Sequence, residues 1–378
     1  MGVTTAVVNA SNTDNQFYVT DISDLSNITS SLWLAPFNTG ENNTQGCVVD
    51  CYGRLAAVGS YQTGSVAIYD LTNPAQPSQQ CLFDTGFGGI GAISINGTKL
   101  LVGEATGPRI ALIDVSNPKN PATLSSQAFS GLGDQSTPGL TGVALVGSVA
   151  IATDCFSIVV LDYSNLSTPQ QLPYLNYEIN FHGPMVCAFD GFTAAVGTAA
   201  YGFTSGSVYL FSVPNGVLGG ITLQNQFEAG IENVTSVAMQ GNVVAACSSS
   251  GTTAIVAYMA PEISSPIVST QVQIGSGGNP DPGGAVKFYG LPANLATSGI
   301  SQADGYPPPP SFNAVTCFSI SNQPQFSANQ IGINNTSSPP LNQGLVYTLG
   351  VASFETFQIP WWKWIWRIIL APFRLLFG

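Results

Sequence analysis

The sequence predicts an all-β protein: a seven-bladed β-propeller whose N- and C-terminal strands share one blade, followed by a C-terminal amphipathic helix. Three observations predict it. A strand–turn–strand pattern recurs along the chain, glycine (41 of 378 residues) and proline (25) are abundant at its turns, and the last residues change abruptly to a cationic, tryptophan-rich run. We therefore expect a β-propeller over residues 1–358 and an amphipathic tail over residues 359–378.

The repeat is clearest where an apolar strand ends in an aspartate that is followed by a turn and a proline. The aspartates lie 44 to 49 residues apart, which is the period of one four-stranded propeller blade; they are Asp21, Asp70, Asp114 and Asp162. Upstream of each copy stand two short strands joined by a tight turn, for example at Asn96-Gly97. Glycine suits such a turn because it tolerates positive φ.

Six complete blades are predicted, at residues 46–87, 89–131, 140–180, 182–228, 231–274 and 280–330. The stretch 3–36 contains only the later strands of a blade, and 343–358 offers the missing early strand. Together they would form a seventh blade that closes the ring, which removes the exposed sheet edges that template aggregation. The least regular stretch, 275–312, contains four consecutive prolines, and we interpret it as a rigid loop.

One repeat resembles a known family. The run Ile113-Asp114-Val115-Ser116-Asn117-Pro118-Lys119-Asn120-Pro121 is similar to the signature of LVIVD-repeat propellers, and Asp70-Leu71-Thr72-Asn73-Pro74 is close to it. The resemblance covers about residues 15–170. It implies a propeller of bacterial or archaeal origin, often exported or surface-linked, and it implies no catalytic residues. We expect the repeated Asp and Asn side chains to hold turns by hydrogen bonds to the backbone.

The charge balance excludes one class of partner. The formal net charge is −12 and only 7% of residues are charged, so a phosphate backbone is repelled and we expect no nucleic-acid binding. The N-terminus has neither a basic stretch nor an apolar one, so no secretory signal is visible. The compartment stays open, although the tail predicts peripheral membrane association.

We find no pattern typical of catalysis, a cofactor or a metal. The seven cysteines fall mostly in apolar strands and are expected to be small buried side chains, with one disulfide left open. Cys47 and Cys51 lack further zinc ligands, and His182 is the only histidine. The run from Gly86 to Gly91 matches G-x-G-x-x-G but precedes a strand instead of a helix, so we interpret it as a turn between blades.

The tail is the candidate binding segment. On a helix, Lys363, Arg367 and Arg374 fall within about 40° of one another, and the remaining surface is apolar. A narrow cationic stripe with tryptophans at one end is typical of a helix lying in a membrane interface. The predicted membrane- or partner-binding residues are Trp361, Trp362, Lys363, Trp364, Trp366, Arg367, Ile368, Ile369, Leu370, Phe373, Arg374, Leu375, Leu376 and Phe377.

Three functions remain open. The first is a non-enzymatic binding or scaffold propeller, tethered to a membrane by residues 360–378 and binding an unknown protein on its faces. The second is a structural component of a larger assembly, with the tail as its docking peptide. The third, an enzyme with a site in the central channel, has only fold analogy in its favour. The tail could also pack on the propeller itself.

Overall fold

The fold is all-β. A computed structural model describes residues 5–11, 16–21, 24, 27, 29–34, 47–129, 139–155, 157–171, 186–198, 206–213, 222–228, 234–240, 243–248, 253–259, 266–273, 285–289, 294–301, 312–321, 327–336 and 348–355. Within these residues every regular element is a strand, and the strands form antiparallel, four-stranded sheets. The all-β prediction is confirmed, and the arrangement is propeller-like.

Six sheets take their four strands in chain order. The first three are built from β4 (Cys47–Tyr52), β5 (Leu55–Ser60), β6 (Ser65–Asp70) and β7 (Ser78–Asp84); from β8 (Ile90–Asn96), β9 (Lys99–Glu104), β10 (Arg109–Asp114) and β11 (Ala122–Ala128); and from β12 (Gly142–Val146), β13 (Val149–Thr153), β14 (Ile158–Asp162) and β15 (Gln170–Gln171).

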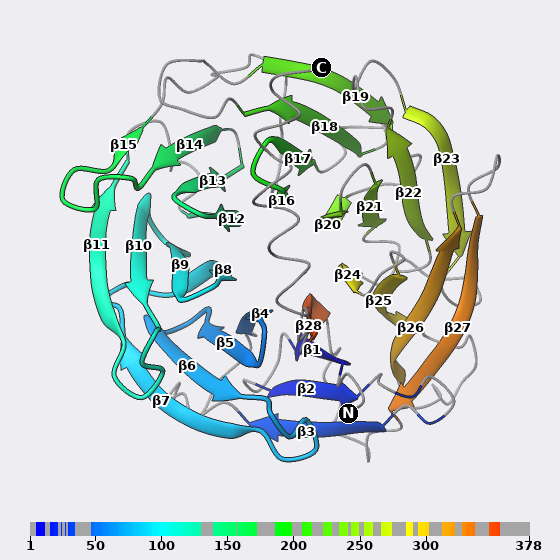
Figure 1. Cartoon of the computed structure of the whole chain (residues 1–378), viewed down its shortest axis with the longest axis horizontal. Helices are drawn as coiled ribbons and strands as arrows, with labels where there is room; N and C mark the ends of the chain where they lie inside the picture. Colours follow the sequence, from blue (N-terminus) through cyan, green and yellow to red (C-terminus); the bar gives the residue numbers. More distant parts are fainter. Residues whose placement is uncertain are drawn as a thin grey trace, which may run out of the picture.

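The next three sheets repeat the same path. They are built from β16 (Val186–Phe189), β17 (Thr193–Gly197), β18 (Ser207–Ser212) and β19 (Thr222–Glu228); from β20 (Val234–Gln240), β21 (Val243–Ser248), β22 (Thr253–Met259) and β23 (Pro266–Gln273); and from β24 (Ala285–Tyr289), β25 (Asn294–Ser301), β26 (Phe312–Ser321) and β27 (Ser327–Thr336). In Figure 1 the first strand of each sheet lies nearest the centre and the fourth lies at the rim.

One further sheet joins the two ends of the described chain. Its order is β28-β1-β2-β3, formed by β28 (Thr348–Glu355), β1 (Thr5–Ser11), β2 (Gln16–Asp21) and β3 (Thr29–Leu34). β28 pairs antiparallel with β1, from Thr5 opposite Glu355 to Ser11 opposite Thr348. β28 takes the innermost place in this sheet, which β4 and β8 take in theirs (Figure 1).

The apolar core lies between consecutive sheets. The second and third strands are buried almost throughout, as in β5 and β6, because both of their surfaces are covered by neighbouring sheets. The outer strands β7 and β11 are half exposed. Each apolar cluster is shared by two sheets; one example combines Ile68 of β6 with Ile90, Leu100 and Ile113 of the next sheet. Burial thus holds the sheets that begin with β28, β4, β8, β12 and β16 each against the sheet that follows it.

Aspartate corners follow the third strands, as the sequence predicts. Asp21, Asp70, Asp114 and Asp162 each end such a strand. For the last three, the N–H two residues further on donates to the aspartate Oδ1 at 2.7 or 2.8 Å. Asn73, Asn117 and Asn165 accept a similar bond at 3.1 to 3.3 Å. The prediction that these side chains hold the turns is confirmed.

Two-residue turns join the first and second strands in the sheets that begin with β4, β8 and β12. Glycine takes the first turn position at Gly53, Gly97 and Gly147, with φ of 59°, 61° and 62°. Only glycine adopts this conformation without strain, and the resulting turn matches the twist of the flanking strands. The hairpin expected at Asn96-Gly97 is confirmed by the pairing of Asn96 with Lys99.

One expectation about the irregular stretch 275–312 is wrong. It is not simply a loop, because β24 and β25 lie within it and pair with each other. Glycine and proline flank these strands and β25 has few apolar residues, so no regular spacing of apolar residues stands out in the sequence. The four prolines lie outside the described residues. The sixth predicted blade also extends further than expected, since β27 ends at Thr336.

Candidate interaction faces

The ends of the strands define two faces of the molecule. We call the first the loop face: it carries the loops between second and third strands and the connections from one sheet to the next. The second is the hairpin face: it carries the hairpins between first and second strands and the aspartate corners. Because every sheet repeats the same path, these features gather on the same side in each of them.

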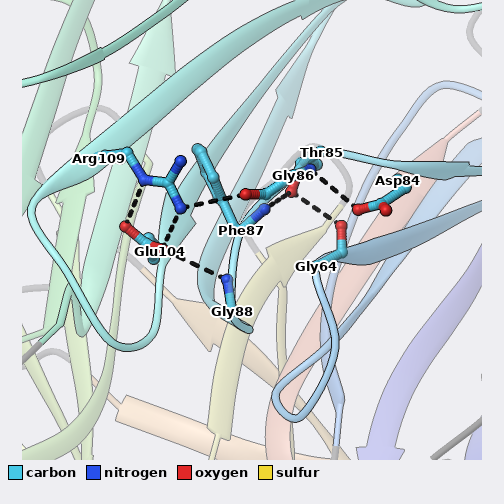
Figure 2. A network of polar contacts seen from close by, with 8 residues as sticks. All are labelled: Gly64, Asp84, Thr85, Gly86, Phe87, Gly88, Glu104 and Arg109. Carbon is cyan, nitrogen blue, oxygen red and sulfur yellow. Dashed lines mark hydrogen bonds and ion pairs between the residues drawn. The ribbon is translucent and has the colours of Figure 1, made fainter.

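A network of polar contacts stands out on the loop face (Figure 2). Glu104, at the end of β9, is only 5% exposed. Its carboxylate accepts from Arg109 Nε at 2.8 Å and from Arg109 Nη2 at 2.5 Å. Arg109 Nη2 also donates to the carbonyl of Gly86 at 3.1 Å, and the guanidinium lies 4.8 Å from the centre of the Phe87 ring. The pair therefore clamps the connection from the preceding sheet.

The clamped connection is the G-x-G-x-x-G match. Gly86 N donates to Asp84 Oδ1 at 2.9 Å, and Thr85 Oγ1 donates to the carbonyl of Gly64 at 2.8 Å (Figure 2). Gly88 N donates to Glu104 Oε1 at 3.3 Å, and β8 begins at Ile90, so the last two residues of the match already belong to that strand. The prediction of a turn between sheets is confirmed. In a nucleotide site the backbone N–H groups of this motif bind phosphate, whereas here the N–H groups of Gly86 and Gly88 bind the protein's own carboxylates.

The electrostatics of the pair are those of a structural contact. The hydrogen bond from Arg109 is the main reason that the pKa of Glu104 lies below its ordinary value, against the opposing effect of burial. The same bond raises the pKa of Arg109. Each partner thus stabilises the charged form of the other, as in a structural ion pair.

Replacing Arg109 by glutamine is expected to lower the free energy of unfolding by about 1–2 kcal/mol at neutral pH. Glu104 is buried and would lose its main partner. The loss of stability stays moderate because the Arg109 side chain is partly exposed and water screens the pair. Because folding depresses the pKa of Glu104, its contribution is present above the unfolded pKa and is lost as pH falls through the folded one. Urea unfolding at neutral and acidic pH measures both effects.

Lys119→Gln is the matched control, since it removes the same charge from an exposed corner. Equal stability of the two variants at neutral pH, or an unchanged difference in acid, would contradict the structural role of the pair.

Similar polar residues recur at the ends of the second strands of four consecutive sheets, as the last strand residue or the one after it. All four are buried and bind nearby backbone: Ser60, Glu104, Asp154 and Thr198. For example, Asp154 Oδ1 accepts from Ser157 N at 2.6 Å. On an innermost strand, buried Asp50 accepts from Ile95 N of the next sheet at 2.8 Å. The buried carboxylates of the described chain thus bind its own backbone, as buried polar groups must.

Exposed apolar side chains favour the hairpin face. Phe192 (61% exposed) lies in the hairpin between β16 and β17, and Tyr52 (50%) ends β4 beside the first hairpin turn. Tyr61 (38%) lies on the loop face and Leu82 (44%) on the outer strand β7. Among the residues whose side-chain exposure the structure describes, the two most exposed large apolar ones are therefore both aromatic and both at hairpin tips.

The hairpin face also receives the C-terminal end of β28. Glu355 is opposite Thr5, and the next residue, Ala6, is opposite Asp21, which marks an aspartate corner. Phe354 is opposite Ala6, just as Tyr52 in its own sheet is opposite Leu55, the residue that pairs with the corner aspartate Asp70. The chain therefore leaves the last sheet on the hairpin face, just before the predicted tail.

The five cysteines whose state is described behave as structural side chains. Cys51, Cys81, Cys155, Cys187 and Cys247 are thiols. Burial raises the pKa of Cys187 and of Cys247 to about 12, so neither is a ready nucleophile. Among the described residues no three histidine, cysteine or acidic side chains gather as a metal site would require.

The predicted binding residues of the tail, from Trp361 to Phe377, lie outside the described residues, as does His182. No helix suited to spanning a membrane occurs in the part of the chain that the structure describes. Sequence reasoning did not identify the Glu104–Arg109 pair or the exposed aromatics at the hairpin tips. A usable signal for the pair was the scarcity of charge, since only five basic residues precede the tail.

Comparison with known proteins adds the fold alone. No protein-family model matches the sequence, and no curated protein matches it significantly. A solved structure of a protein from Lactobacillus plantarum is similar over 93% of this chain and 99% of its own, with 10% identity and a TM-score of 0.63.

Two further solved structures are similar. A hypothetical selenium-binding protein from Sulfolobus tokodaii matches over 92% of both chains, with 9% identity and a TM-score of 0.61. Apo AztD from Citrobacter koseri matches over 93% of this chain and 98% of its own, with 9% identity and a TM-score of 0.56. At such identities the shared fold says nothing about a shared ligand or activity.

Proposed function

We propose that this protein is a non-enzymatic seven-bladed propeller that binds a partner protein on its faces and is held at a membrane surface by its cationic, tryptophan-rich tail. Seven four-stranded sheets among the described residues, one of which contains both β1 and β28, support the blade count and the closure of the ring. A closed ring is a rigid platform with no free sheet edge.

The observation that carries the proposal is the position of Glu355. The last described strand ends there, at the edge of the hairpin face, and the predicted tail follows directly. A ring whose last strand is already paired has no vacant strand position for residues 359–378. Their apolar surface therefore needs another environment, and the headgroup region of a bilayer suits tryptophan and cationic side chains.

A binding role is supported by the hydrogen bonds that the polar side chains make within the protein. Glu104, Asp154 and Asp50 bind backbone or Arg109, and the corner aspartates bind the turns that follow them. These bonds stiffen both faces, and a rigid, preorganised surface loses less entropy when it binds a partner.

Deleting residues 359–378 is expected to abolish sedimentation with vesicles of equal parts phosphatidylcholine and phosphatidylglycerol, while the thermal transition stays unchanged. The deletion removes four tryptophans and three cations, which supply the apolar burial and the attraction to anionic lipid. A matched variant, Lys363→Gln/Arg367→Gln/Arg374→Gln, keeps the apolar residues and is expected to bind less tightly, with a weaker dependence on salt.

Two outcomes would overturn the tether. One is equal vesicle binding by the truncated chain. The other is that a synthetic tail peptide binds no vesicles but forms a defined complex with a co-purifying protein in the absence of lipid. That second result would favour the alternative function, in which the chain is a component of a larger assembly and the tail is its docking peptide.

A further inference from the structure

The hairpin face combines three features that no other part of the described surface shares. It carries Tyr52 and Phe192, the two most exposed of the large apolar side chains whose exposure is described. It is the face on which β28 ends, at Glu355. Of the cationic side chains whose surroundings are described, Arg54, Lys99 and Lys119 lie at its turns, whereas Arg109 is on the loop face.

From these features we infer that the hairpin face is the side of the propeller that lies against the lipid surface, with Tyr52 and Phe192 entering the headgroup region. The inference rests on the proposed membrane tether and adds an orientation to it. Tyrosine and phenylalanine at turn tips fit this place, since an aromatic ring gains from the apolar boundary and the tyrosine hydroxyl stays hydrated.

The positions of the contacts fix the orientation. Tyr52 belongs to the sheet that begins with β4, Phe192 to the sheet that begins with β16, and Glu355 to the sheet that contains β28. Figure 1 shows β4 and β28 together on one side of the centre and β16 on the other. Three separated points define a plane, so a tail inserted beside β28 and two aromatic tips would hold the ring flat on the membrane, with the loop face towards the solution.

The negative charges on the hairpin face limit its electrostatic attraction to anionic lipid. Asp70, Asp114 and Asp162 also lie on this face, at the ends of the third strands β6, β10 and β14, so the body itself is not strongly attracted to anionic lipid. The contribution of the aromatic tips therefore comes from apolar burial, which salt does not screen, whereas that of the cationic tail weakens with salt.

The test compares two double variants of the full chain. Tyr52→Ser/Phe192→Ser removes the aromatic tips, and Tyr61→Ser/Leu82→Ser removes exposed apolar side chains from the loop face and the rim. Vesicles of equal parts phosphatidylcholine and phosphatidylglycerol are the probe. We expect the first variant to partition roughly tenfold less onto them, at low and high salt alike, and the second to bind as the parent does. Unchanged thermal transitions show that both remain folded.

Hydrogen exchange of the parent chain gives an independent readout. With vesicles present, we expect slower exchange in the hairpins at residues 52–55 and 190–193 and no change in the loop-face segments 61–64 and 85–89. Two results would overturn the orientation while the tether stands. One is slower exchange on the loop face instead of the hairpin face. The other is equal vesicle binding by the two double variants, when that binding still depends on the tail. Failure of the parent chain to bind vesicles overturns both.

Discussion

A chain truncated after Gly344, which lacks β28 as well as the tail, is expected to lose cooperative unfolding and to aggregate. β28 is the innermost strand of its sheet, pairs with β1 along the whole of Thr5–Ser11, and contacts β4 and β24 in the neighbouring sheets. Its loss would expose an edge of β1 and open the centre of the molecule. We expect a cost on the order of 5 kcal/mol or more, comparable with the total stability of many domains.

The matched control is a chain that ends at Gln358 and keeps β28. It should unfold in a single transition at the temperature of the full chain, as measured by circular dichroism and calorimetry. If both truncated chains unfold alike, then β28 does not close the ring, and the proposed seventh blade is wrong.

The second large effect is expected for Gly89→Ala on the loop face. A methyl group at this position would overlap the carbonyl oxygen of Tyr61, and backbone cannot turn aside as a flexible side chain can. The carbonyl of Gly89 also accepts from Ala105 N at 2.8 Å, so this connection cannot move away from Tyr61 without losing that hydrogen bond. We expect a loss of about 3 kcal/mol in the free energy of unfolding.

Gly53→Ala is the control for this substitution. Nothing lies within 4 Å of the added methyl, so only the positive φ of 59° opposes it, at a cost of about 1 kcal/mol. Urea unfolding distinguishes the two. A Gly89→Ala variant as stable as Gly53→Ala would mean that the neighbouring loops do not approach each other as closely as described.

The repeats could be predicted because their signals are local. An aspartate that ends a strand and an asparagine three residues later make bonds within their own turn, so Asp70 and Asn73 could be interpreted without knowing the fold. The hairpin turns are local in the same way. β24 and β25 could not be interpreted so easily, because short strands in a glycine-rich stretch depend on pairing partners that are distant or weakly patterned.

The contacts between sheets lay beyond the reach of the sequence for the opposite reason. Glu104 and Arg109 are close in sequence, but the Gly86 carbonyl and the Phe87 ring reach them only when two sheets pack together. The bond from Ile95 N to Asp50 joins residues on two different sheets. Exposure at Tyr52 and Phe192 is likewise a property of the assembled ring, since aromatic residues in strands are usually buried.

The attachment of the tail to β28 has a mechanical consequence. A pull on the C-terminal side of Glu355, perpendicular to the ring, acts along the length of β28. Because β28 and β1 run antiparallel, their hydrogen bonds lie across the direction of force and must shear together instead of opening one at a time. A protein fastened through such a joint would resist being dragged from its anchorage with the strength of the whole strand pair.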